Sequence, residues 1–155
     1  MSKTSLLLVC CLAVALGCIS CSEIRHRVSQ FSEQDITREK LQQYERFMHL
    51  TFPGSTRALN AAYESGGLDD AVFLKVEMDK QDVEAFVKNS PFANATLRSD
   101  QSPIHNRQDL PWWNPDGAKT YKAGQVILPS NGALNMLVDF DDEMKAVVYL
   151  TWGKL

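Results

Sequence analysis

All four cysteines of this 155-residue chain lie within its first 21 residues, MSKTSLLLVCCLAVALGCISC. The rest of the chain therefore cannot form an internal disulfide framework, a cysteine metal site or a thiol nucleophile. It has to fold by burying apolar side chains around a core of its own. Its length suits one such domain and is too short for two.

The leader has the organisation of an export signal. Lys3 precedes an apolar run over residues 6–16, which is about the length of a signal-peptide core. That run is too short for a membrane span of roughly 20 residues. It ends in the letters ALGC, and small or apolar residues before Cys18 are similar to the lipobox of bacterial lipoproteins. We expect residues 1–17 to be removed, Cys18 to carry lipid, and residues 18–31 to form a tether; an ordinary secretory signal is the alternative.

This interpretation places the domain outside the cytoplasm, anchored to a membrane of the cell envelope, the outer membrane in a Gram-negative host. Cleavage would remove Lys3 and no acidic residue. The 16 basic and 19 acidic side chains would then become 15 and 19, and the net charge would change from −3 to −4. Basic residues do not cluster, so a nucleic acid partner is not expected. The expected partners are the membrane, through the lipid, and an envelope protein, peptide or glycan.

A helix is predicted after Ser32. Ser32 followed by Asp35 resembles a capping box, and Pro53 ends the helical pattern because the residue before a proline disfavours the helical conformation. Between them, apolar residues recur near one face, as in an amphipathic helix, at Ile36, Leu41, Tyr44, Phe47 and Met48.

The following residues mostly have the pattern of strands. Residues 56–63 are interpreted as a strand, with a short helix as the alternative, and residues 71–78 alternate as in a strand with one buried face. A short helix is expected after Asp79. Three further strands are predicted at residues 121–128, 134–140 and 145–152.

Together these elements predict a single α+β domain over residues 32–155. We expect an antiparallel sheet of about four to five strands with one or two helices packed on one face. The last hairpin allows a prediction of register. If residues 142–143 form its loop, Val138 faces Val147 and apolar groups share one face of both strands.

Residues 91–119 show no periodicity and contain four prolines. Such a long irregular segment in a small domain tends to be functional or packed by its own side chains. It holds two adjacent tryptophans, Trp112 and Trp113. In the preferred interpretation both indoles anchor the loop to the core. In the second, one indole projects beside Arg107 and Tyr121 as a binding platform, so these four residues are the candidate binding site.

Catalytic and metal-binding motifs are sparse. There is no histidine pair at metal-helix spacing, no Gly-x-Ser-x-Gly elbow and no phosphate-binding glycine loop. A general base formed by His105 with Asp109 or Asp116 is the basis of an alternative function, a small envelope hydrolase. The acidic residues at 139–143 lack the glycine and the later glutamate of a calcium loop. We therefore expect no catalytic residue, no metal and no cofactor.

Five short stretches also carry a resemblance, namely LDD at 68–70, FLK at 73–75, SPF at 90–92, LPWWNP at 110–115 and VVYL at 147–150. Together they resemble a group of small uncharacterised bacterial secreted or lipid-anchored proteins with a PWW-x-P segment before a closing β-hairpin. The resemblance extends over residues 50–152, and the tryptophan pair is its most specific part. That group has no assigned activity, so the resemblance implies a single-domain lipoprotein and no catalytic residue.

The leading functional expectation is a non-enzymatic, lipid-anchored envelope protein that binds a partner through its 91–119 loop. The hydrolase based on His105 is the alternative. A third possibility is a purely structural partner that pairs through an exposed sheet edge.

Overall fold

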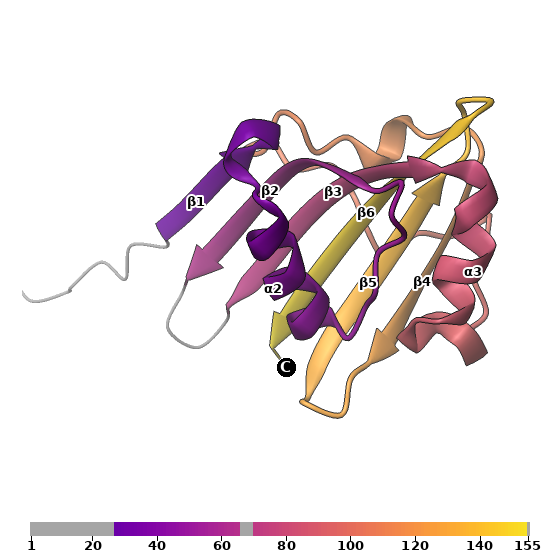
Figure 1. Ribbon diagram of the computed structural model, residues 1–155. Helices are drawn as coiled ribbons and strands as arrows, with labels where there is room; N and C mark the ends of the chain where they lie inside the picture. Colours follow the sequence, from indigo (N-terminus) through magenta and orange to yellow (C-terminus); the bar gives the residue numbers. More distant parts are fainter. Residues whose placement is uncertain (1–26, 66–69, 155) are drawn as a thin grey trace, which may run out of the picture.

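The computed structural model describes residues 27–65 and 70–154. The leader, Cys18 and the first part of the predicted tether lie outside these residues. Six strands form one antiparallel sheet in the order β1-β2-β3-β6-β5-β4 (Figure 1). The strands are β1 (Arg27–Ser32), β2 (Arg57–Ser65), β3 (Ala71–Asp79), β4 (Tyr121–Ile127), β5 (Gly132–Asp139) and β6 (Lys145–Lys154).

Two α-helices, α2 (Arg38–Met48) and α3 (Val83–Lys88), complete the α+β architecture that the sequence predicted. The sheet has six strands, slightly more than the four to five that the sequence predicted. Within the described residues, neither helix is long and apolar enough to cross a membrane.

The additional strand is β1, which occupies residues 27–32 where the sequence analysis placed the end of a tether. It pairs antiparallel with β2, from Arg27 opposite Ser65 to Ser32 opposite Asn60. Its sequence signal is weak because it is an edge strand in which only Phe31 packs against the core. Pairing with β2, and not an apolar pattern of its own, accounts for this strand.

The predicted capping box is present, but it does not start the helix. The Asp35 carboxylate accepts hydrogen bonds from the Ser32 amide at 3.0 Å and from the Ser32 hydroxyl at 2.7 Å, around a single 3-10 turn. The helix α2 begins three residues later, where the Thr37 hydroxyl accepts from the Lys40 amide. It ends at Met48 because His49 adopts the left-handed conformation, with φ of 54°.

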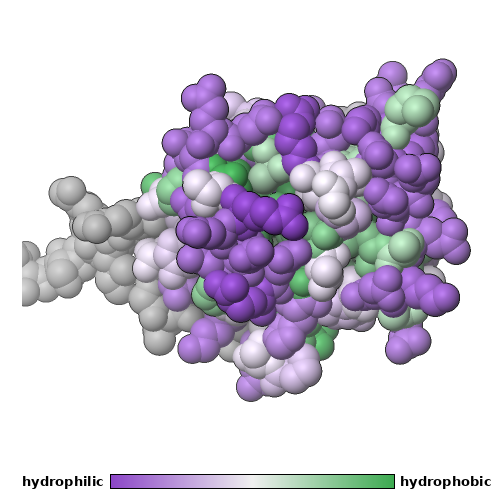
Figure 2. Space-filling model, in the orientation of Figure 1, coloured by the Kyte–Doolittle hydropathy of each residue, from purple (hydrophilic) through white to green (hydrophobic). Residues whose placement is uncertain are grey.

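The two faces of the sheet carry two separate cores. On one face, Met48 of α2 and Phe86 of α3 pack over buried strand residues such as Leu74. In Figure 1 α2 lies in front of the central strands, and its outer surface is mostly hydrophilic in Figure 2. On the opposite face, which we call the loop face, Leu110 and Trp113 from the long irregular segment cover the sheet. Both helices therefore pack on one face as predicted, while a loop covers the other face.

The last hairpin shows why the register prediction is wrong by one residue. Val138 pairs with Val148, and Asp139 pairs with Val147. The strands are joined by residues 140–144, a longer turn than expected. Within it the Asp142 carboxylate accepts the amide hydrogens of Met144 and Lys145, both at 2.8 Å. The shift brings Val138 and Val148 together in the core beneath the helices, where both are fully buried.

Candidate functional site

The long irregular segment is attached to the sheet at both ends. Arg98 and Ala123 exchange two backbone hydrogen bonds of 2.8 Å, so Arg98 extends the sheet beyond the edge strand β4. At the other end, the Asp141 carboxylate accepts from the amides of Lys119 and Thr120 at 2.9 and 2.7 Å. The segment between these two attachments, residues 98–120, lies on the loop face.

Trp113 anchors this segment. Its side chain is 2% exposed, and its ring stands edge-on to Phe73 and Tyr149 with centroids 5.4 and 5.2 Å away. Its indole N–H donates to the carbonyl of His105 at 3.1 Å, so the buried polar atom has the partner that burial requires. The geometry matches the anchoring interpretation for this tryptophan.

Trp112 is half-buried and is also bound to the sheet. Its indole N–H donates to the Gln30 side-chain oxygen of β1 at 3.0 Å. Its carbonyl accepts from the Lys75 ammonium at 3.2 Å. Burial lowers the pKa of Lys75, partly offset by the negative charge of Asp139. The polar groups of Trp112 thus bind strand residues and do not form a free platform.

Arg107, the third candidate residue, is held by internal partners. Its guanidinium lies 4.5 Å from the centre of the Phe73 ring and forms ion pairs with Asp109 at 2.7 Å and with Glu64. Hydrogen bonds to Asp109 and Glu64 raise the pKa of Arg107 despite its partial burial. Arg107 therefore connects the loop to β2, and Asp109 is occupied by this contact.

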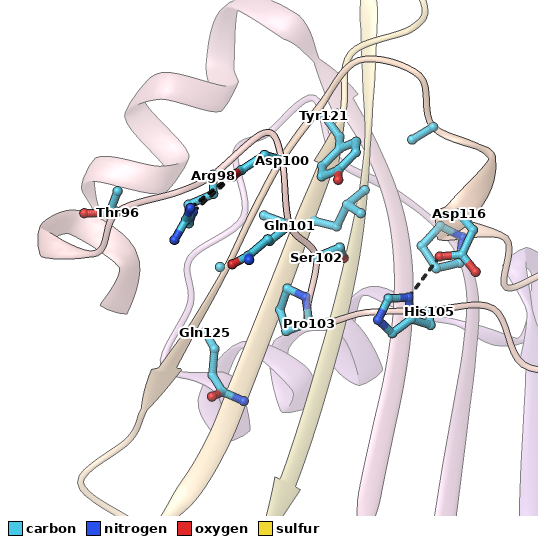
Figure 3. Close-up of a pocket in the computed structure, with 15 residues that line it drawn as sticks. Thr96, Arg98, Asp100, Gln101, Ser102, Pro103, His105, Asp116, Tyr121 and Gln125 are labelled. Atoms are coloured by element: carbon cyan, nitrogen blue, oxygen red, sulfur yellow. Dashed lines mark hydrogen bonds and ion pairs between the residues drawn. The ribbon is translucent and has the colours of Figure 1, made fainter.

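The fourth candidate residue, Tyr121, lies elsewhere, in a depression of about 670 Å³ on the loop face. The depression lies between residues 96–105, residues 115–118 and the strands β4 and β5 (Figure 3). Part of its floor is apolar, from Ala123 and Leu137. Polar side chains form its rim, among them Tyr121, Gln101, His105, Asp116 and Gln125. Neither tryptophan and no atom of Arg107 lines it, so the structure separates Tyr121 from the other three candidate residues.

One of the two histidine–aspartate pairs considered in the sequence analysis is present at this rim. His105 Nδ1 lies 3.2 Å from Asp116 Oδ1. The other oxygen of Asp116 accepts from the Asn106 amide at 2.9 Å, and the Asn106 side chain accepts from the Asp116 amide. The His105 side chain is 72% exposed, so water competes with this contact and weakens it. The Ser102 hydroxyl donates to the Ile104 carbonyl at 2.8 Å and not to His105.

The charged side chains that line the depression are all paired. Arg98 and Asp100 form an ion pair of 3.0 Å, and this contact lowers the pKa of Asp100. His105 faces Asp116, as described above, and the lining contains no other charged residue. The guanidinium and both carboxylates of the lining therefore already have partners among the described residues.

A second, smaller hollow of about 270 Å³ adjoins the first and shares Pro103 and His105 with it. A row of hydrogen-bonded side chains joins the two hollows across three strands. Gln125 Nε2 donates to Asn135 Oδ1 at 2.7 Å, and Asn135 Nδ2 donates to Thr151 Oγ1 at 2.8 Å. We call these three residues the amide ladder. Sequence reasoning missed it, although a polar residue at the same face position of three neighbouring strands is a signal once the register is known.

In the described part of the chain, no three His, Cys, Asp or Glu side chains converge in a way that would hold a metal ion.

In comparisons with known proteins, no family model, no curated protein and no solved structure matches this chain.

Proposed function

We propose that this protein is a lipid-anchored component of a bacterial cell envelope that binds a partner in the depression beside Tyr121 and does not transform it. The observation that carries the proposal is the depression itself, which combines an apolar floor with polar rim groups on one concave surface. Concave sites of this composition are the usual form of binding sites for small molecules and polymer segments. Binding thus involves the 91–119 loop through residues 96–105 and 115–118, whereas the tryptophans act as anchors.

The way the depression is built supports binding by a preformed site. Strands β4 and β5 supply its floor, and Trp113 fastens the overlying loop to the sheet. Sites that are built on strands and supported by packed side chains lose little entropy when a ligand binds.

A small hydrolase is the second candidate, because His105 and Asp116 are within hydrogen-bond distance at the rim. In such an enzyme His105 would act on a water molecule as a general base. Its other proposed partner, Asp109, is bound to Arg107.

Photocrosslinking in cells distinguishes the two candidates. With p-benzoylphenylalanine in place of the exposed rim residue Gln101, we expect a covalent adduct in the membrane fraction. If the site only binds, Tyr121→Ala and His105→Ala should both lower the adduct yield, about fivefold for a contact at the centre of the site. If the site is hydrolytic, Tyr121→Ala should lower the yield, whereas His105→Ala should raise it because bound substrate is no longer turned over.

The matched control places the same crosslinker at Gln42, an exposed residue of α2 on the opposite face of the sheet. An adduct at position 42 equal to that at position 101, or no adduct at position 101, would count against the depression as the binding site.

The proposed anchor is tested separately. Cys18→Ser should abolish incorporation of radiolabelled palmitate and move the protein from the membrane fraction to the soluble fraction, because a serine hydroxyl cannot take the thioether-linked lipid. Cys21→Ser is the matched control and should leave both readouts unchanged. Labelling that persists in the Cys18→Ser variant would show that the lipid, if any, is attached elsewhere.

A further inference from the structure

Several polar groups that line the depression are uncharged and lack a partner among the described residues. They include the Tyr121 hydroxyl, the Gln101 amide and the side-chain oxygen of Gln125, for which no hydrogen bond is formed within the described chain. From this distribution we infer that the occupant of the depression is a neutral oligosaccharide. This inference rests on the proposed binding function and names the chemical class of its ligand.

Charge matching argues against an ionic ligand. Arg98 is bound by both oxygens of Asp100, and the Asp116 carboxylate is bound by His105 and by the Asn106 amide. An acidic ligand would have to compete with Asp100 for Arg98, and a basic ligand would have to compete with the groups that already bind the two carboxylates. Ligand selection at a site whose ionised groups already have partners depends on hydrogen bonds and shape, and hydroxyl groups satisfy uncharged donors and acceptors without a desolvated ion.

Backbone pairing argues against an extended peptide. A peptide that added a strand to the sheet here would need the outward-facing N–H and C=O groups of β4. Those of Ala123, in the floor of the depression, are already bonded to Arg98 in both directions at 2.8 Å. A partner that lies over Ala123 therefore cannot pair with its backbone there and has to bind through side chains, as a sugar can.

The amide ladder gives the site its length. Its three residues occupy successive strands, which lie about 4.8 Å apart in a sheet. Gln125 lines the first hollow, and Asn135 and Thr151 line the second. The bonds of 2.7 and 2.8 Å along the ladder hold the amide planes in place. Polar groups are thus presented over a distance greater than one sugar ring, which fits an oligosaccharide better than a monosaccharide.

Tyr121 supplies the aromatic surface that such a ligand needs. Its side chain is half-buried, and its hydroxyl points into the depression with Gln101 on one side and His105 on the other (Figure 3). The carbon-bound hydrogens of a sugar ring can pack against this phenol and the apolar floor, while the sugar hydroxyls bond to the amides.

The test is a calorimetric titration of the full-length lipidated protein in a detergent without a sugar headgroup. The probes are three neutral tetrasaccharides, those of cellulose, amylose and chitin, and the acidic tetrasaccharide of hyaluronan. We expect at least one neutral probe to bind more tightly than the acidic one. Gln125→Ala and Asn135→Ala should each weaken that binding by about tenfold at most, the effect of losing a neutral hydrogen bond, and more when combined. Lys122→Ala, on the same strand as Gln125 but on the helix face, should leave it unchanged.

Circular dichroism of each variant verifies its fold, and Gln125 is exposed, so its replacement leaves the core intact. The inference is overturned if no neutral probe binds, if the acidic probe binds more tightly, or if Gln125→Ala and Lys122→Ala bind equally well. If the crosslinker at position 101 still captures a partner in cells and the adduct resists periodate, the binding function stands and the occupant is a protein. Loss of both the crosslink and sugar binding would remove the proposed function as well.

Discussion

Replacing Trp113 with alanine is expected to lower the free energy of unfolding by about 3–5 kcal/mol, the range for truncating a large buried aromatic side chain. Trp113 is 2% exposed and packs edge-on against Phe73 and Tyr149. Truncation would leave a cavity on the loop face and would remove the donor to the His105 carbonyl. Urea unfolding followed by far-ultraviolet circular dichroism measures the change without relying on tryptophan emission.

Trp112→Ala is the matched control for this prediction. Because Trp112 is only half-buried and forms one side-chain hydrogen bond, its truncation should cost about 1–2 kcal/mol. An equal or larger loss for Trp112→Ala would contradict the assignment of Trp113 as the main anchor. Trp113 does not line the depression, but it fastens the loop that forms one of its walls. Trp113→Ala should therefore also weaken ligand binding.

The second large effect is a loss of stability at alkaline pH that depends on Tyr149. This tyrosine is 4% exposed, and burial, together with the negative charge of Asp139, raises the pKa of Tyr149 to about 12. An unfolded tyrosine has a pKa of about 10. Between these pH values the folded chain keeps a proton that the unfolded chain releases, so the free energy of unfolding falls as the pH rises. The expected loss is about 2–3 kcal/mol by pH 12.

The comparison between the wild-type chain and Tyr149→Phe isolates this contribution. Tyr44, whose pKa burial also raises, acts in the same direction in both proteins. Lys75 acts in the opposite direction, because its pKa is lowered by burial and its folded form releases a proton first. The difference in free energy of unfolding between the two proteins should be constant up to about pH 10. Above that pH the wild-type chain should lose stability relative to Tyr149→Phe. Profiles that stay parallel to pH 12 would contradict the prediction.

The fold class follows from patterns that are local in the sequence. Alternation over residues 71–78 predicts β3 because a strand with one face in the core has a period of two residues. The register of the last hairpin does not follow in this way, because it depends on the length of the turn, where the Asp142 side chain bonds to the amides of Met144 and Lys145. Strand β1 also escapes local analysis, since it is stabilised by pairing with β2, which lies far along the chain.

Sequence reasoning identified the tryptophan pair and its preferred role as an anchor, because two large apolar side chains in an irregular segment gain free energy by burial. It also considered His105 with either of two aspartates, and only tertiary contacts determined that Asp116 is its neighbour while Asp109 binds Arg107. The depression and the amide ladder could not be derived from the sequence. Their residues come from segments far apart in the chain, and only the strand order and register place them side by side.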